Sequence, residues 1–147
     1  DQLAMCHTID FSERLEVDYP TIPLAELLLQ KTQIVKLSEK DVKDIIVLLR
    51  EHGVGHRDAE TVNVGYAAEL LSRDWGFYYT VTTNLRKVRG LTQGYPALSE
   101  EDRRDVIGKI DQILAAIEEV PKSLSWKMRA KMGPSKKWYR EVDTPRR

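Results

Sequence analysis

The stretch PTIPLAELLLQKTQIVKLSEKDVKDIIVLL, residues 20–49, predicts two helices joined by a very short link. The first helix is expected from Leu24 to about Val35, with an apolar face through positions 24, 27, 28, 31 and 35. Position 31 on that face is a lysine. The segment SEKD, Ser38 to Asp41, has the spacing of a capping box and predicts the start of the second helix. A lysine on an inward face needs an explanation, because burying an unpaired ammonium group is costly.

Two explanations for Lys31 are open. Its side chain can extend to solvent or pair with a carboxylate of the next helix, or it can border a polar cleft that holds an anion. Asp41 and Asp44 share a face of the second helix, which the short link would bring near Lys31. The purely structural alternatives are a capping role for Asp41 and a pair with Lys40 for Asp44. In a cleft, a lysine and an aspartate would suit phosphate binding and proton transfer from an attacking hydroxyl.

The rest of the chain predicts an α+β fold that is predominantly α. At the start, LAMCHTIDF and RLEVDY read as two short strands joined by a turn near Ser12 and Glu13, which predicts a β-hairpin. About six helices are expected to follow, the first two forming a helical hairpin. Gly53 and Gly55 are expected to end the second helix in the left-handed region. RGLTQGYPAL, residues 89–98, is predicted to be a loop.

Further helices are predicted from capping residues and apolar spacing. Asn63, Asp74 and Ser99 precede three of them, and SLSWKMRAKM, residues 123–132, predicts a last short one. The segment WGFYYTVTTNLRKV has strand-like composition but helical spacing, so we expect a helix there. The positions expected to face the core are Val42, Ile45, Ile46 and Leu49; Val64, Ala67, Ala68 and Leu71; Trp75, Tyr78, Thr82 and Leu85; and Val106, Ile110, Ile113, Leu114 and Ile117.

Composition predicts a soluble globular protein. The 147 residues are 41% apolar and 31% charged, which suits a domain with a core of its own. The sequence has no apolar run long enough to span a bilayer, and DQLAMCHTID has no signal-peptide pattern, so we expect a cytoplasmic protein without a membrane contact. Cys6 is the single cysteine, which excludes an internal disulfide and a cysteine-based zinc site. Cys6 and His7 are adjacent on a strand and point to opposite faces, so they do not form a nucleophile and base.

Charge is divided unevenly along the chain. Residues 1–121 carry 14 basic and 21 acidic side chains, whereas residues 122–147 carry nine basic and two acidic. We therefore expect a body, residues 1–121, and a basic C-terminal helix and arm, residues 122–147. In the arm, aromatic residues alternate with the candidate phosphate contacts Lys127, Arg129, Lys131, Lys136 and Lys137. This pattern suits single-stranded nucleic acid, or alternatively an arm whose Trp126, Trp138 and Tyr139 anchor it to the body.

Carboxylates and histidines elsewhere do not predict a metal site. Glu16 and Asp18 project from one side of a predicted strand, where they would either hold a divalent metal or form a solvated face. His52 and His56 lie near the end of the second helix without a third ligand in the sequence, so we interpret them as surface residues.

The stretch from Leu15 to Leu49 resembles the C-terminal part of bacterial nucleotidyltransferase-family proteins of the minimal nucleotidyltransferase type, including the abortive-infection toxin branch. The matching patterns are LxxLLxxK, present in IPLAELLLQK and ending at Lys31, and (K/R)DxxDhxxLL, present in KDVKDIIVLL with Asp41 and Asp44. The segments MCHTIDF, DWGFYYTVTTNL and PKSLSWKMRAKMG extend the likeness to bacterial proteins that carry the same family label.

The resemblance implies transfer of a nucleoside monophosphate from a nucleoside triphosphate to a hydroxyl, with Mg²⁺ held by carboxylates. Lys31 would contact the phosphates, and Asp41 or Asp44 would be the acidic partner. The Gly-Ser turn and paired-Asp strand that bind the metal in this family are absent from these residues. We therefore expect either a C-terminal portion whose site is completed by upstream strands or a degenerate relative. The alternative is a non-enzymatic helical module that binds protein or RNA through the basic arm.

Overall fold

The computed structural model describes residues 2–10, 12–14 and 22–141. The described part is α+β and predominantly helical, as the sequence predicts. Two pairs of short strands accompany six α-helices, and the elements in chain order are β1 (Gln2–Ala4), β2 (Thr8–Asp10), α1 (Leu24–Thr32), α2 (Glu39–Glu51), β3 (Gly53–Gly55), β4 (Thr61–Asn63), α3 (Val64–Leu71), α4 (Trp75–Gln93), α5 (Glu100–Glu119), α6 (Leu124–Met132) and the short 3₁₀ helix η1 (Gly133–Ser135).

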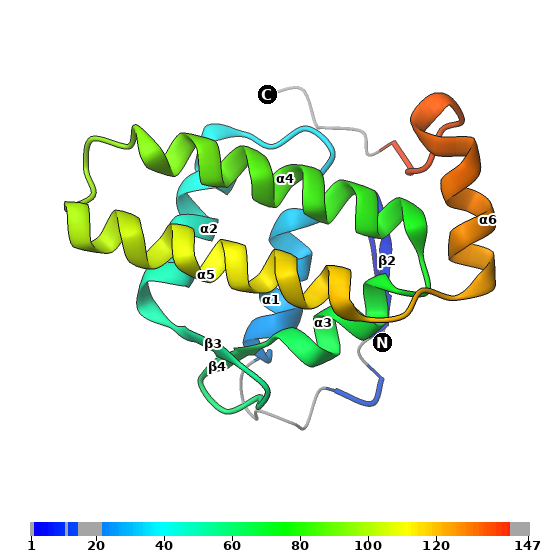
Figure 1. The fold of residues 1–147 in the computed structure, drawn as a ribbon, viewed down its shortest axis with the longest axis horizontal. Helices are drawn as coiled ribbons and strands as arrows, with labels where there is room; N and C mark the ends of the chain where they lie inside the picture. Colours follow the sequence, from blue (N-terminus) through cyan, green and yellow to red (C-terminus); the bar gives the residue numbers. More distant parts are fainter. Residues whose placement is uncertain (1, 11, 15–21, 142–147) are drawn as a thin grey trace.

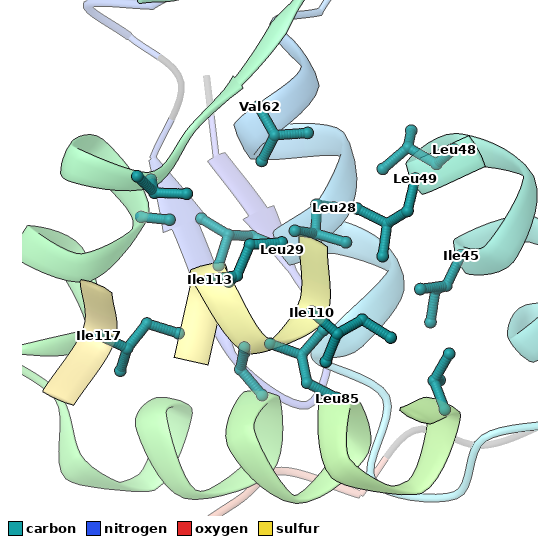
Figure 2. Close-up of a cluster of buried hydrophobic side chains, with 14 of the residues drawn as sticks. Leu28, Leu29, Ile45, Leu48, Leu49, Val62, Leu85, Ile110, Ile113 and Ile117 are labelled. Atoms are coloured by element: carbon teal, nitrogen blue, oxygen red, sulfur yellow. The ribbon is translucent and has the colours of Figure 1, made fainter. Parts of the chain in front are cut away.

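The core lies between the two longest helices and α1. Helices α4 and α5 run side by side along the long axis of the molecule, and α1 and α2 lie behind them (Figure 1). Figure 2 shows Leu28 and Leu29 of α1 meeting Ile110 and Ile113 of α5, with Leu85 of α4 beside them. All five side chains are buried. The predicted inward faces of α2, α3 and α5 are confirmed, except that Leu114 is only partly buried.

The predicted inward face of α1 was only partly correct. Leu28 is in the core, and Leu24 and Leu27 pack against it while partly buried, whereas Lys31 and Val35 are only half-buried. Helix α1 ends at Thr32 instead of near Val35, and its buried residues are Ala25, Glu26, Leu28, Leu29 and Thr32. Because α1 contacts α2, α3, α4 and β4, its buried face is set by several neighbours, and it is rotated away from the face that the apolar pattern predicts. Lys31 lies at the margin of this face and is half-buried. The charge that points inward is Glu26, which is 0% exposed.

Glu26 is stabilised by an arginine from the preceding segment. Arg14 donates from Nε to Glu26 Oε1 and from Nη2 to Asp58 Oδ1, 2.6 Å away. Its guanidinium also lies 3.9 Å from the centroid of the Tyr66 ring. Although burial lowers the pKa of Arg14, the bonds to Glu26 and Asp58 raise it above its ordinary value. This network joins the N-terminal segment, α1, the β3–β4 connection and α3.

The two small sheets differ from the predicted hairpin and helix end. Strands β1 and β2 pair antiparallel with Leu3 opposite Ile9, so the hairpin forms inside the segment that was predicted to be one strand. The predicted second strand, with Glu16 and Asp18, lies outside the described residues. Helix α2 ends just before His52, whose backbone is extended with φ −127° and ψ 147°. Gly53 and Gly55 do not adopt the left-handed conformation that was expected of them. They form β3, which pairs parallel with β4.

Local capping signals place the helix starts correctly. The capping box of Ser38 and Asp41 is complete, and the side chains of Asn63, Asp74 and Ser99 each accept a backbone N–H of the first turn. The segment WGFYYTVTTNLRKV, whose composition suggested a strand, is helical, as predicted from its spacing. Helix α4 continues to Gln93 and so includes part of the predicted loop, because the periodic burial of α4 extends through Val88 and Thr92. Thr92, which is fully buried, donates its hydroxyl to Val88 O within that last turn.

Arg14→Met tests the buried pair. The variant leaves the Glu26 carboxylate buried without its cation, so we expect the free energy of unfolding to fall by about 3–5 kcal/mol. The double variant Arg14→Met/Glu26→Met removes both charges and should recover most of that loss, since apolar replacement of a buried pair is often tolerated. Urea unfolding followed by circular dichroism measures both values. A double variant as unstable as the single one would contradict this account of Glu26.

Candidate functional site

The lysine and one of the aspartates singled out in the sequence meet between α1 and α2. Lys31 Nζ lies 3.0 Å from Asp44 Oδ2, and the two side chains are 32% and 35% exposed. The partner of Asp44 is therefore Lys31, in place of the Lys40 considered from the sequence. A charge-assisted bond of this length fixes the ammonium group while about a third of each side chain remains open to solvent.

A hollow of about 240 Å³ adjoins this pair. Its walls combine the apolar side chains of Leu27, Val47 and Leu48 with the polar groups of Lys31, Asp44, Glu51 and His52. Val47 is 55% exposed, which is unusual for a large aliphatic residue on a helix and places apolar surface at the mouth of the hollow. The hollow has apolar walls with a few convergent polar groups, as small-ligand sites do, but its volume lies below the roughly 300–1,000 Å³ that is usual for such sites, so it has room for only part of a nucleotide.

Asp41 does not join this group. Its Oδ2 accepts from the backbone N–H of Ser38 at 3.0 Å and from the Ser38 hydroxyl at 2.8 Å. The backbone N–H of Asp41 in turn donates to Ser38 Oγ. The capping box therefore accounts for Asp41, and of the two predicted acidic partners the structure brings only Asp44 to Lys31.

The end of α1, next to Lys31, is held by a residue that the sequence reading missed. Asn84 of α4 is buried, and its Nδ2 donates to Thr32 O at 2.8 Å and to Ile34 O at 2.7 Å. Thr32 is the last residue of α1 and Ile34 lies just beyond it, so neither carbonyl has a helix partner of its own. The sequence contained a signal for this role, because Asn84 is a polar residue beside the buried positions of an amphipathic helix. Buried amides are almost always hydrogen-bonded, so a partner for Asn84 could have been expected. Asn84 thereby fixes the position of the turn that carries Lys31.

The basic arm borders a second and larger hollow, which we call the arm cleft. It has a volume of about 740 Å³ and lies between α6, residues 137–140, the start of α4 and the turn between β1 and β2. Of the five candidate cations in the arm, Arg129 and Lys137 line it. The other three, Lys127, Lys131 and Lys136, are exposed and lie outside its lining. Arg73 and Arg140 line the cleft but were not predicted.

Aromatic residues anchor the arm to the body, as one of the two sequence interpretations expected. The indole N–H of Trp138 donates to Thr80 Oγ1 of α4 at 3.0 Å, and its ring meets the Tyr79 ring edge-on, 4.9 Å between centroids. The backbone N–H of Arg140 donates to Cys6 O at 3.0 Å. Trp126 meets Tyr78 edge-on in the same way. The described part of the arm is therefore a docked segment.

His7 lies under this docked arm. Its ring is stacked on Phe77 at 5.0 Å, and its Nε2 is 2.8 Å from the same Thr80 hydroxyl that accepts from the arm. Burial lowers the pKa of His7, although the charge of Asp74 acts in the opposite direction. Cys6, its neighbour, is only partly buried.

Within the described residues, no group of three or more histidine, cysteine, aspartate or glutamate side chains could hold a metal ion. None of the helices in that part of the chain is long and apolar enough to cross a membrane. Comparison with protein-family models, with curated proteins and with solved structures found no match to this chain.

The buried His7 predicts a pH-dependent stability. The unfolded chain binds a proton at about pH 6.5, whereas folded His7 has a lowered pKa. Below about pH 6.5 the unfolded state therefore binds more protons, and the free energy of unfolding should decrease as the pH falls towards the folded-state pKa. Urea titrations between pH 7.5 and 5 should show a weaker decrease in His7→Gln than in the wild type. The control is His56→Gln, at an exposed position, and an equal slope in all three proteins would contradict the prediction.

Proposed function

We propose that this chain supplies the phosphate-binding helical part of a nucleotidyltransferase-like site. The observation that carries the proposal is the pair of Lys31 Nζ and Asp44 Oδ2, 3.0 Å apart at the edge of a hollow. These two residues stand at the lysine and aspartate positions of the motifs that resemble the nucleotidyltransferase family. The pair comes from two separate helices, so the sequence motif alone does not require the contact.

The geometry allows a ligand contact beside the ion pair. Lys31 and Asp44 are about one-third exposed and line the hollow, so a ligand in the hollow can reach both side chains. A lysine ammonium has three donors, and the bond to Asp44 uses one of them. Among the described residues, Lys31 Nζ has no hydrogen-bond partner besides Asp44, so its other donors can meet the oxygens of a triphosphate, which lysines commonly bind as point charges.

Asp44 would have two roles, holding the ammonium group of Lys31 and accepting the proton of the acceptor hydroxyl. In nucleotidyl transfer, the oxygen of the acceptor hydroxyl forms a bond to the α-phosphorus while the bond to the leaving pyrophosphate breaks. The hydroxyl proton must go to a base, and Asp44 is the carboxylate nearest Lys31 that can receive it. Asp41 is not proposed for this role, because it caps α2.

Magnesium is not assigned to the described residues, because they contain no cluster of carboxylates or histidines that fits a metal ion. The family's metal-binding turn and strand have no counterpart in this sequence. The proposal for this chain is therefore limited to holding phosphate and positioning or accepting a proton.

Lys31→Met in the natural full-length protein tests the proposal. The variant keeps an aliphatic side chain but removes the charge, and losing one charge-assisted contact of about 1.5–3 kcal/mol weakens binding by roughly 10- to 100-fold. Isothermal titration with ATP, GTP, CTP and UTP in magnesium buffer measures the affinity. Asp44→Asn should reduce the transfer rate more than it reduces nucleotide affinity.

Lys40→Met is the matched control, because Lys40 is an exposed lysine near the start of α2. It should bind nucleotide like the wild type. Unchanged binding in Lys31→Met, or equal losses in Lys31→Met and Lys40→Met, would remove the proposed role of Lys31.

A further inference from the structure

We propose that the arm cleft binds single-stranded nucleic acid, with cations at its rim contacting phosphates and aromatic rings in its wall stacking on bases. The cleft has a volume of about 740 Å³, which is within the usual range for ligand sites. It is a different site from the hollow at Lys31, and the two have no lining residue in common. Helices α2 and α6 also lie towards opposite ends of the molecule in Figure 1.

The charges around the cleft favour a polyanion. Arg73 and Arg140 are exposed at its lining, and Lys137 adds a third cation whose side chain is 54% exposed. Arg73 pairs with Glu69 and Lys137 pairs with Glu141, and both are exposed surface pairs that a phosphate would have to displace. The acidic residue in the lining, Asp74, is already engaged, since its Oδ1 accepts the backbone N–H of Phe77. Residues 122–147 carry nine basic and two acidic side chains, so the segment that forms one wall has a strong positive excess. Such a surface attracts phosphate backbones irrespective of base sequence.

The aromatic residues favour single strands over duplexes. Trp126 and Tyr139 line the cleft and are half-buried. The ammonium groups of Lys122 and Lys137 lie 5.8 and 5.3 Å from the centroids of the Trp126 and Tyr139 rings, so a stacked base would share these rings with them. Bases of a single strand can stack on such rings, whereas the bases of a duplex are already stacked on one another. Trp75 is not available for stacking, because it is buried between the Tyr79 ring and the Arg129 guanidinium.

The walls of the cleft are fixed by specific contacts. Arg129 donates to Gly133 O at 2.8 Å and to Lys136 O at 2.7 Å, which holds the turn that follows α6 within the arm. Trp138 is fastened to Thr80 by its indole N–H. At Gly76 the arm approaches so closely that a Cβ atom would lie 2.7 Å from Trp138 O. A glycine at the start of α4 is therefore required for the observed position of the arm.

Fluorescence anisotropy with labelled 12-nucleotide single-stranded RNA and DNA tests the proposal. Three phosphate contacts predict that log K falls with log salt concentration at a slope of roughly −2, since each contact to a single strand contributes about −0.7. The double variant Arg73→Ala/Arg140→Ala leaves one rim cation, so the slope should fall to about −0.7 and the affinity at least tenfold. Arg86→Ala/Arg104→Ala, which removes two exposed cations outside the cleft, should behave like the wild type.

Two further variants separate stacking and arm position from charge. Tyr139→Ala keeps every cation and should weaken single-strand binding at least fivefold while the salt slope stays unchanged. Gly76→Ala displaces the arm and should also weaken binding, with circular dichroism confirming that the helices remain. The proposal is overturned if neither single strand binds below millimolar concentration, if a duplex of the same length binds equally well, or if the cleft variants match their control. Because nucleotide binding at Lys31 is measured separately, failure here leaves the proposed function untouched.

Discussion

The burial of Glu26 is the constraint on which the rest of the account depends. A carboxylate with 0% exposure requires a cation, and Arg14 supplies it from a segment that precedes α1. Fixing Glu26 towards the interior also fixes the rotation of α1 about its axis. Lys31 follows five residues later, which corresponds to roughly 140° around an α-helix. Lys31 is consequently turned to the margin of the buried face, where α2 presents Asp44.

The other end of α1 is held by α4. Asn84 satisfies the carbonyls of Thr32 and Ile34, so a shift of the last turn of α1 would leave one buried and one partly buried acceptor without its donor. The position of Lys31 is therefore determined by a buried ion pair on one side and a buried amide on the other. Both interactions are polar and directional, which makes the placement of the lysine more specific than apolar packing alone would make it.

Sequence reasoning succeeded where the determining interactions are local. The capping residues Ser38, Asn63 and Asp74 act within one helical turn, and the faces of α2, α3 and α5 follow from a strong 3.6-residue period. The expected meeting of Lys31 with an aspartate of the next helix was also correct for Asp44. This success rested on the short link between the two helices.

Prediction failed where distant segments decide the structure. The leucine pattern of α1 predicted an inward face that is rotated relative to the observed one. The observed orientation depends on Arg14, which lies twelve residues before Glu26 in the sequence. The glycines after α2 are typical of a helix C-terminus. In the structure they form β3, which pairs parallel with β4, and no nearby residue in the sequence predicts this pairing. In the same way, the arm cleft depends on residues from four elements, and only the arm's own cations and aromatics could be identified from the sequence.

The most direct test of the central claim is an NMR measurement of the lysine side-chain ammonium groups of the natural full-length protein during titration with a nucleoside triphosphate. Asp44→Asn and Lys31→Met spectra assign the Lys31 resonance and its bond to Asp44. The account predicts that the Lys31 ¹⁵Nζ resonance shifts saturably with nucleotide while that of the exposed Lys40 does not. A nucleotide that binds without moving the Lys31 resonance would contradict the account.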